Sequence, residues 1–301
     1  TNVVFVFINY NGTGNQTLEK EEYARQITIE NNYSLLNVEP YSSNQDAFNF
    51  FYVNATGTVE NYTQGWTTYA SETREQVAAL SASCIVPNKK VVALVDWFFR
   101  SNAAIGGEST RISLLDSEVF TDLESTSKLL AHEFGHLFGA LRDEYEAGNP
   151  IAEIGNDQCF YSPAVNCTEY EYRPGFFTSI CSQTNESIAA CQISSPWQDL
   201  ITDTCTDYEI SRCTEDACDI SCRIVESCVV TGCLSGRNLV RHNFNTIMRY
   251  QGLDPFSYGT NNQRLLCRKI TDVSGIAGGI CSTLCMDGCS EGQRCIGGVC
   301  T

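Results

Sequence analysis

Hydrophobic residues in the first third of the chain follow two alternating patterns, short apolar runs and longer segments with helical spacing. The apolar runs are typical of strands, and the longer segments are typical of amphipathic helices. The predicted strands are 3–8, 48–53 and 91–95, and the predicted helices are 18–36 and 71–83, the second beginning at Ser71. Strands that alternate with helices indicate an α/β protein with a mostly parallel, twisted sheet. The runs 3–8 and 91–95 carry no polar alternation, so we expect both strands to be buried on both faces.

A glycine pair precedes one further strand-like run. Gly106 and Gly107 lead into residues 108–115, which predict an edge strand. An exposed edge is a surface on which an extended peptide can add as a further strand. Shortly afterwards, Ser125, Thr126 and Ser127 are candidate caps for the next helix.

That helix, within the segment 129–145, carries the residues with the clearest chemistry. His132 and His136 are four positions apart, so a helix places them on one face, about 40° apart around its axis. Apolar residues occupy the opposite side, namely Leu130, Phe134, Leu137 and Leu141. Glu133 lies about a quarter-turn from His132, within reach of a water molecule held by the two imidazoles. This His-Glu-x-x-His arrangement is typical of zinc hydrolases, in which the histidines bind the metal and the glutamate acts as a base.

A second motif makes the first more specific. The chain has only three histidines and two methionines, and one methionine stands in the run Thr246-Ile247-Met248-Arg249-Tyr250. A His-Glu-x-x-His helix followed by such a run resembles the metzincin metallopeptidases. The resemblance implies a metzincin-like catalytic domain with a methionine turn at 245–250. In that fold Met248 would lie beneath the zinc site as an apolar floor without binding the metal.

The chain departs from the longer metzincin signature, His-Glu-x-x-His-x-x-Gly-x-x-His, at the third metal ligand. That position is Arg142, a permanent cation with no lone pair to donate. Asp143 and Glu144 follow, and a carboxylate can serve as a zinc ligand. Residues 141–145 resemble the Leu-x-Asp-Glu-Tyr that ends this helix in the IgA-specific metallopeptidase family, which favours Asp143 before Glu144. His242 is a third alternative, because some metzincins place their last histidine after a long insertion.

The resemblance implies a reaction as well as a site. Zn²⁺ held by His132, His136 and Asp143 would activate a bound water molecule, and Glu133 would accept its proton and pass it to the leaving amine. Tyr250 would contact the metal or the oxyanion, or would pack below the turn. The substrate would be an extended polypeptide, and IgA itself is not implied.

Cysteines divide the chain unevenly. All but Cys84 of the 17 lie at position 159 or later. This number predicts many disulfides and an oxidising compartment, and an odd count leaves at least one thiol without a partner inside the chain. We expect a catalytic domain over 1–271 with a disulfide-stapled, irregular insertion at about 146–236, and a small disulfide-rich module over 272–301.

The end of the expected catalytic domain has its own pattern. Residues 261–270 predict a helix that closes the domain, with Cys267 as its anchor. A glycine-rich linker follows at 275–279. The knot beyond it contains five cysteines, at 281, 285, 289, 295 and 300.

Net charge, hydrophobicity and glycosylation motifs limit the classes of binding partner and the cellular locations that fit this sequence. The formal net charge of −17 disfavours nucleic acid and anionic membrane surfaces as partners. No apolar run approaches the roughly 18 residues of a membrane span, and the start at Thr1 suits a processed secreted chain. Seven sequons are candidate glycosylation sites: Asn11, Asn15, Asn32, Asn54, Asn61, Asn166 and Asn185.

Together these features predict a secreted or cell-surface zinc endopeptidase. The alternative is a structural or adhesive surface protein built on a metallopeptidase scaffold. Such a protein would assemble through its surface or through an unpaired cysteine.

Overall fold

The structure is a computed structural model. The residues that it describes are 1–10, 19–59, 71–96, 101–103, 105–114, 122–144, 157–161, 166–173, 176–182, 190–191, 193–201, 226–230, 239–243, 246–248, 256–275, 277–290 and 293–301. The chain divides into two compact units. The first unit contains 1–140 and 269–276, and the second contains 141–268 and 277–301.

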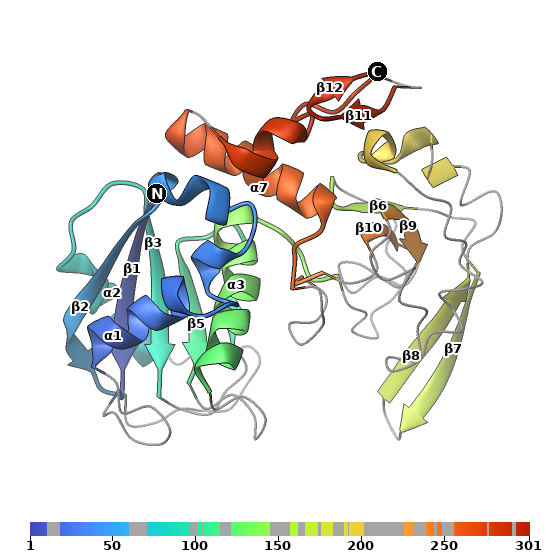
Figure 1. Cartoon of the computed structure of the whole chain (residues 1–301). Helices are drawn as coiled ribbons and strands as arrows, with labels where there is room; N and C mark the ends of the chain where they lie inside the picture. The colour runs from blue at the N-terminus through green and yellow to red at the C-terminus, as the bar shows by residue number, and fades with distance from the viewer. Residues whose placement is uncertain are drawn as a thin grey trace. The chain divides into compact units, whose positions relative to one another are not determined.

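A five-stranded sheet forms the centre of the first unit (Figure 1). Its order is β2-β1-β3-β5-β4, with four parallel strands and an antiparallel β4. The strands are β1 (Asn2–Ile8), β2 (Asn49–Gly57), β3 (Lys89–Val95), β4 (Asn102–Ala103) and β5 (Ser109–Ser113). The helical elements are α1 (Lys20–Arg25), the π-helical η1 (Gln26–Glu30), the 3₁₀ turns η2 (Leu35–Asn37) and η3 (Ser42–Ala47), α2 (Ser71–Ala82) and α3 (Leu123–Gly139). The predicted α/β class and the first three predicted strands are therefore confirmed.

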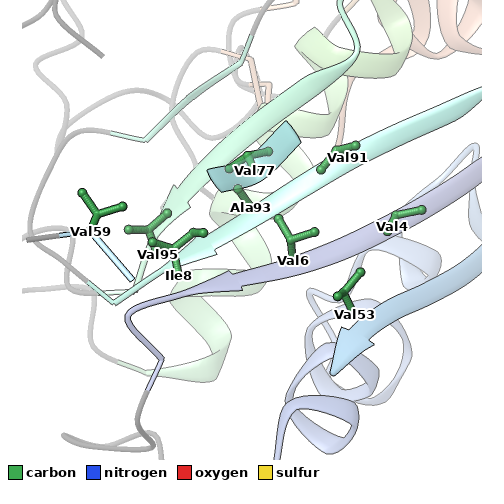
Figure 2. Close-up of a cluster of buried hydrophobic side chains, with 9 residues drawn as sticks. All are labelled: Val4, Val6, Ile8, Val53, Val59, Val77, Val91, Ala93 and Val95. Atoms are coloured by element: carbon green, nitrogen blue, oxygen red, sulfur yellow. The ribbon is translucent and has the colours of Figure 1, made fainter. Parts of the chain in front are cut away.

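Both faces of β1 are covered, as its unbroken apolar sequence predicts. On one face the even-numbered residues of β1 join β3 and α2 in an aliphatic cluster, shown in Figure 2. Its buried members are Val4, Val6, Ile8, Val53, Val59, Val77, Val91, Ala93 and Val95. On the other face Phe5 stacks on Phe50 and Phe7 meets Tyr10. The alternation of faces along β1 sets the sheet between two helical layers.

Helix α3 joins the sheet on its β5 side (Figure 1). Its apolar face inserts Phe134 and Phe138 among Tyr41 and Phe48. The rings of Phe134 and Phe138 stack with centroids 5.6 Å apart, as expected for residues one turn apart on a helix. This aromatic packing buries the apolar side of α3 and fixes its rotation about its own axis.

Two sequence predictions in this unit are wrong in detail. The helix predicted for 18–36 ends at Glu30, because Asn31 is extended and its side-chain amide donates to the carbonyl of Gln26. The predicted edge strand at 108–115 is also not the end of the sheet. Among the described residues, β4 lies outside β5 and pairs with Thr110 and Arg111, because the chain folds back before it enters β5.

The second unit is built from small antiparallel sheets and helix α7. A three-stranded sheet has the order β6-β10-β9, and β7 pairs with β8 as a hairpin. The elements are β6 (Cys159–Tyr161), β7 (Asn166–Arg173), β8 (Phe176–Ser182), η4 (Gln198–Leu200), β9 (Glu226–Val230), β10 (Leu239–Asn243) and α7 (Thr260–Ser274), whose last residues belong to the first unit. The region predicted as irregular thus contains strands, and the aromatic and β-branched residues of 166–173 and 176–182 are the strand signal that the prediction missed.

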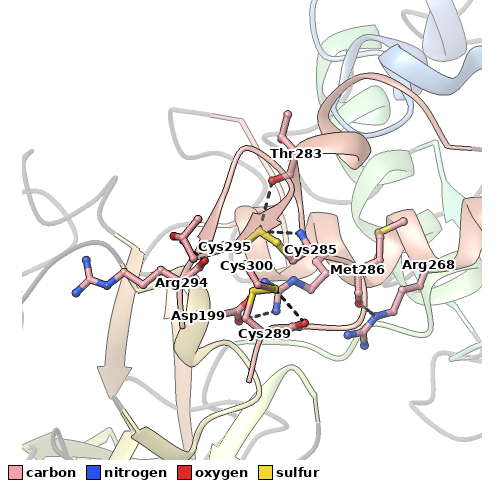
Figure 3. Close-up of polar contacts among 12 residues, drawn as sticks. Asp199, Arg268, Thr283, Cys285, Met286, Cys289, Arg294, Cys295 and Cys300 are labelled. Atoms are coloured by element: carbon pink, nitrogen blue, oxygen red, sulfur yellow. Dashed lines mark hydrogen bonds and ion pairs between the residues drawn. A yellow bond between two sulfur atoms is a disulfide. The ribbon is translucent and has the colours of Figure 1, made fainter. Parts of the chain in front are cut away.

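The C-terminal residues form a disulfide knot. It contains η5 (Gly279–Thr283) and a hairpin of β11 (Cys295–Ile296) and β12 (Val299–Cys300). Figure 3 shows Cys285 bonded to Cys295 and Cys289 bonded to Cys300. Cys267 of α7 bonds to Cys281, which confirms its predicted role as the anchor of this helix. The knot is therefore tied covalently to α7, and these disulfides agree with an oxidising compartment.

None of the helices that the structure describes is long and apolar enough to cross a membrane.

Candidate metal centre

Helix α3 begins at a defined cap. The side chain of Asp122 accepts a hydrogen bond of 2.7 Å from the backbone N–H of Ser125, as a helix N-cap does. The caps predicted at 125–127 are therefore wrong, because the helix begins one turn earlier. Thr126 and Ser127 instead donate their hydroxyls to carbonyls one turn back in the same helix.

His132 and His136 lie together on α3, as the spacing predicts. Both side chains are buried, and their Nε2 atoms are 3.2 Å apart. The two rings are nearly perpendicular, with centroids 4.7 Å apart. Two nitrogens bound to one tetrahedral zinc at about 2.05 Å would be separated by about 3.3 Å. The pair therefore has the spacing that a shared zinc ion requires.

Glu133 stands between these histidines in sequence and is also buried, with 4 % of its surface exposed. A carboxylate is rarely buried to this degree without a structural or chemical reason. The helix thus carries two imidazoles and one carboxylate into a water-poor environment within a single turn.

The end of α3 is held by the glycine loop before β5. Ala140 adopts the left-handed conformation at the helix end, with φ of 54°. The backbone N–H of Gly106 donates to the carbonyl of His136 at 2.8 Å, and a Cβ on Gly106 would lie only 3.3 Å from that of Ala140. Beside it, the ammonium of Lys90 donates to the carbonyl of Gly107, and burial lowers the pKa of Lys90. The glycine pair before β5 is therefore a close support for the helix that bears the histidines.

The residues after α3 form a clamped segment in the second unit. The side-chain amide of Gln158 accepts from the N–H of Arg142 at 2.7 Å and donates to its carbonyl at 2.8 Å. Glu144 is buried, and its N–H donates to the carbonyl of Met248 at 2.9 Å. Asp143 lies between these two held residues and is partly exposed, whereas Arg142 is exposed.

Residues 246–248, the described part of the run predicted as a methionine turn, are buried. Thr246, Ile247 and Met248 each have at most 3 % of their surface exposed. The N–H of Ile247 donates to the carbonyl of Ser257 at 2.8 Å, which ties the turn to the residues just before α7. Met248 is thus a fixed, apolar side chain next in space to the backbone of Glu144.

Side chains that could hold a metal ion form three groups among the described residues. One is His132, His136 and Asp143, in which a ligand atom from each residue lies within 4.8 Å of the others. The other two groups consist of knot cysteines, one of them with Asp199. Those cysteines are bonded in disulfides, so their sulfurs are not thiolates that could bind a metal. The histidine group is therefore the one with suitable chemistry.

Some of the remaining predicted residues lie outside the part of the chain that the structure describes. Tyr250 and the sequon residues Asn11, Asn15, Asn61 and Asn185 lie outside the described residues. Asn32 and Asn54 are exposed, Asn166 begins β7, and His242 lies in β10. Cys84 is the free cysteine of the described part of the chain.

Comparison with known proteins finds no protein-family model and no curated protein that matches this sequence.

Proposed function

We propose that this protein is a zinc-dependent endopeptidase whose metal is held by His132, His136 and Asp143. The observation that carries the proposal is the 3.2 Å separation of two buried Nε2 atoms, with a glutamate next to one of them. A buried pair of imidazoles at this spacing suits a tetrahedral divalent cation. The sequence motif and the geometry thus point to the same chemistry.

Asp143 is the third ligand that this environment favours. Its neighbour Glu144 accepts hydrogen bonds at both carboxylate oxygens, from Gln158 and Asn262 at one and from Thr246 at the other. Binding zinc through Glu144 would compete with these bonds, whereas Asp143 belongs to the group whose ligand atoms lie within 4.8 Å. Zinc bound by two histidines and one carboxylate keeps a position open for catalysis.

The catalytic roles follow from the residue types. Zinc, when bound, supplies a Lewis acid that polarises a peptide carbonyl and brings the pKa of water to about 7. Glu133 would take the proton from the attacking water and deliver it to the departing amine, a role typical of a buried carboxylate in a water-poor site. Tyr250 would serve as a donor to the oxyanion, and Met248 as the apolar floor of the site.

The reaction would take place outside the cell. Disulfides persist in oxidising compartments, and the described chain contains three in its last 35 residues. The substrate would be an extended polypeptide.

The replacement Glu133→Gln tests the proposal. The variant should retain zinc by elemental analysis and lose casein hydrolysis by about 10²–10⁴-fold, because an amide cannot accept the proton. Glu124→Gln is the matched control: it lies on the same helix but forms an exposed ion pair with Lys128, so it should leave both properties unchanged.

Three results would contradict the proposal. Unchanged hydrolysis by Glu133→Gln would remove Glu133 from the mechanism. A wild-type protein without stoichiometric zinc would remove the metal. Large assemblies in light scattering, together with absent hydrolysis, would favour the structural or adhesive alternative.

A further inference from the structure

Glu144 is a buried carboxylate that the peptidase mechanism does not use. Only 3 % of its surface is exposed. A buried carboxylate is costly unless it is hydrogen-bonded, so the partners of Glu144 indicate what its burial accomplishes.

The carboxylate of Glu144 joins three separate parts of the second unit. Its Oε1 accepts from Gln158 Nε2 at 3.1 Å and from Asn262 Nδ2 at 2.8 Å, and its Oε2 accepts from the hydroxyl of Thr246. These partners come from the segment before β6, from α7 and from the methionine turn. Hydrogen bonds to an ionised acceptor are about twice as strong as neutral ones.

The same partners reach the residue on the other side of Asp143. The side-chain oxygen of Gln158 accepts from the backbone N–H of Arg142, and its side-chain nitrogen donates to the carbonyl of Arg142. The same nitrogen also donates to Glu144. The backbone of Glu144 is bound to Met248 as well. The backbone on both sides of Asp143 is therefore fixed by one connected network, and Asp143 has little freedom to move as a whole.

We propose that Glu144 is a positioning residue: its carboxylate locks the segment 142–144 so that Asp143 is held ready to bind the metal. The proposal rests on the peptidase function, because it takes Asp143 as a ligand. Outer partners that orient a metal ligand typically change metal affinity by about 10–100-fold when they are replaced. Preorganisation of this kind lowers the entropy lost on binding.

The test measures zinc affinity of the purified full chain by competition with a chromophoric chelator, with the metal-free melting temperature as a second readout. Glu144→Gln replaces one carboxylate oxygen by an NH₂ group. If the remaining oxygen still accepts from Gln158 and Asn262, the NH₂ group faces Thr246 and cannot accept its hydrogen bond. We expect its Kd for zinc to rise by about 10–100-fold. Thr246→Val removes a single donor with little change in shape, and we expect a rise of several-fold in the same direction.

The control is Gly298→Ala in the disulfide knot. A Cβ on Gly298 would lie 2.2 Å from the carbonyl oxygen of Ser282, and neither residue belongs to the network around Glu144. The variant should lower the melting temperature of the metal-free chain without changing the Kd for zinc.

The outcomes separate the two proposals. If the wild type binds zinc tightly and Glu144→Gln loses stability but keeps the same Kd, Glu144 is only structural and the positioning role is overturned. If Glu144→Gln does not fold, an unchanged Kd in Thr246→Val overturns it equally. If the wild type binds no zinc, the proposed function fails, and the positioning role fails with it.

Discussion

The ion pair between Arg264 and Asp199 allows a stability prediction that can be worked from the structure. Arg264 Nη1 and Nη2 donate to the two carboxylate oxygens of Asp199 at 2.9 and 2.5 Å. The side chains are 1 % and 2 % exposed, so neither charge is hydrated to any useful extent. The pair connects η4 to α7. Arg264 lies two residues after Asn262, whose side chain donates to Glu144.

Replacing Asp199 with alanine should cost about 3–5 kcal/mol of the free energy of unfolding, because it leaves the guanidinium buried without its counter-charge. That loss is a large part of the roughly 5–15 kcal/mol that stabilise a typical domain. The double replacement Asp199→Leu with Arg264→Met should instead be close to neutral, since it removes both charges and keeps the volume filled.

The assay is urea unfolding followed by fluorescence of Trp197, which is fully buried and two residues from Asp199. Trp66 and Trp97 are replaced by phenylalanine in every variant so that one tryptophan reports. Asp157→Ala is the comparison, because Asp157 and Arg268 form a solvent-exposed ion pair in the same unit as Trp197 and such a pair contributes at most about 1 kcal/mol. If Asp199→Ala costs no more than Asp157→Ala, the reasoning from burial is refuted.

Three further predictions concern other parts of the chain. Gly298→Ala should destabilise the knot by about 1–3 kcal/mol more than Gly297→Ala in thermal unfolding. Both residues have positive φ, but a Cβ on Gly298 would lie 2.2 Å from the carbonyl oxygen of Ser282, whereas a Cβ on Gly297 would meet no atom within 4 Å. Equal losses in the two variants would contradict this. Asp122→Ala should cost about 1 kcal/mol in urea unfolding by removing the cap on Ser125, and no loss would reject the cap. Chelation of zinc should lower the melting temperature of the wild type but not of variants that lack a ligand histidine, and an equal response would mean that the metal binds elsewhere.

Local patterns explain why much of the first unit could be predicted. The runs at β1 and β3 are apolar without interruption, and such runs become strands covered on both faces. His132 and His136 are one turn apart, so helix geometry alone brings their rings together. In each case the information lies within a few neighbouring residues.

Features that depend on distant partners were not predictable in this way. The end of the first helical segment depends on side-chain bonds of Asn31, one of which reaches Ser127. The position of β4 outside β5 depends on where the preceding loop returns. The strands β7 and β8 had a local signal in their aromatic and β-branched residues, but the density of cysteines and polar residues around them obscured the pattern.

The third ligand illustrates the same division at the level of chemistry. Composition leaves Asp143 and Glu144 equivalent, because both are carboxylates at the end of the same helix. What separates them is the set of partners around Glu144, two of which lie 102 and 118 residues away in sequence. A motif can therefore predict which residue types bind a metal, whereas the choice between adjacent carboxylates depends on the partners that the fold gives each of them. Both oxygens of Glu144 accept hydrogen bonds that zinc would have to replace, which favours Asp143 as the proposed ligand, and exchanging the two residues should weaken zinc binding even though the number of carboxylates is unchanged.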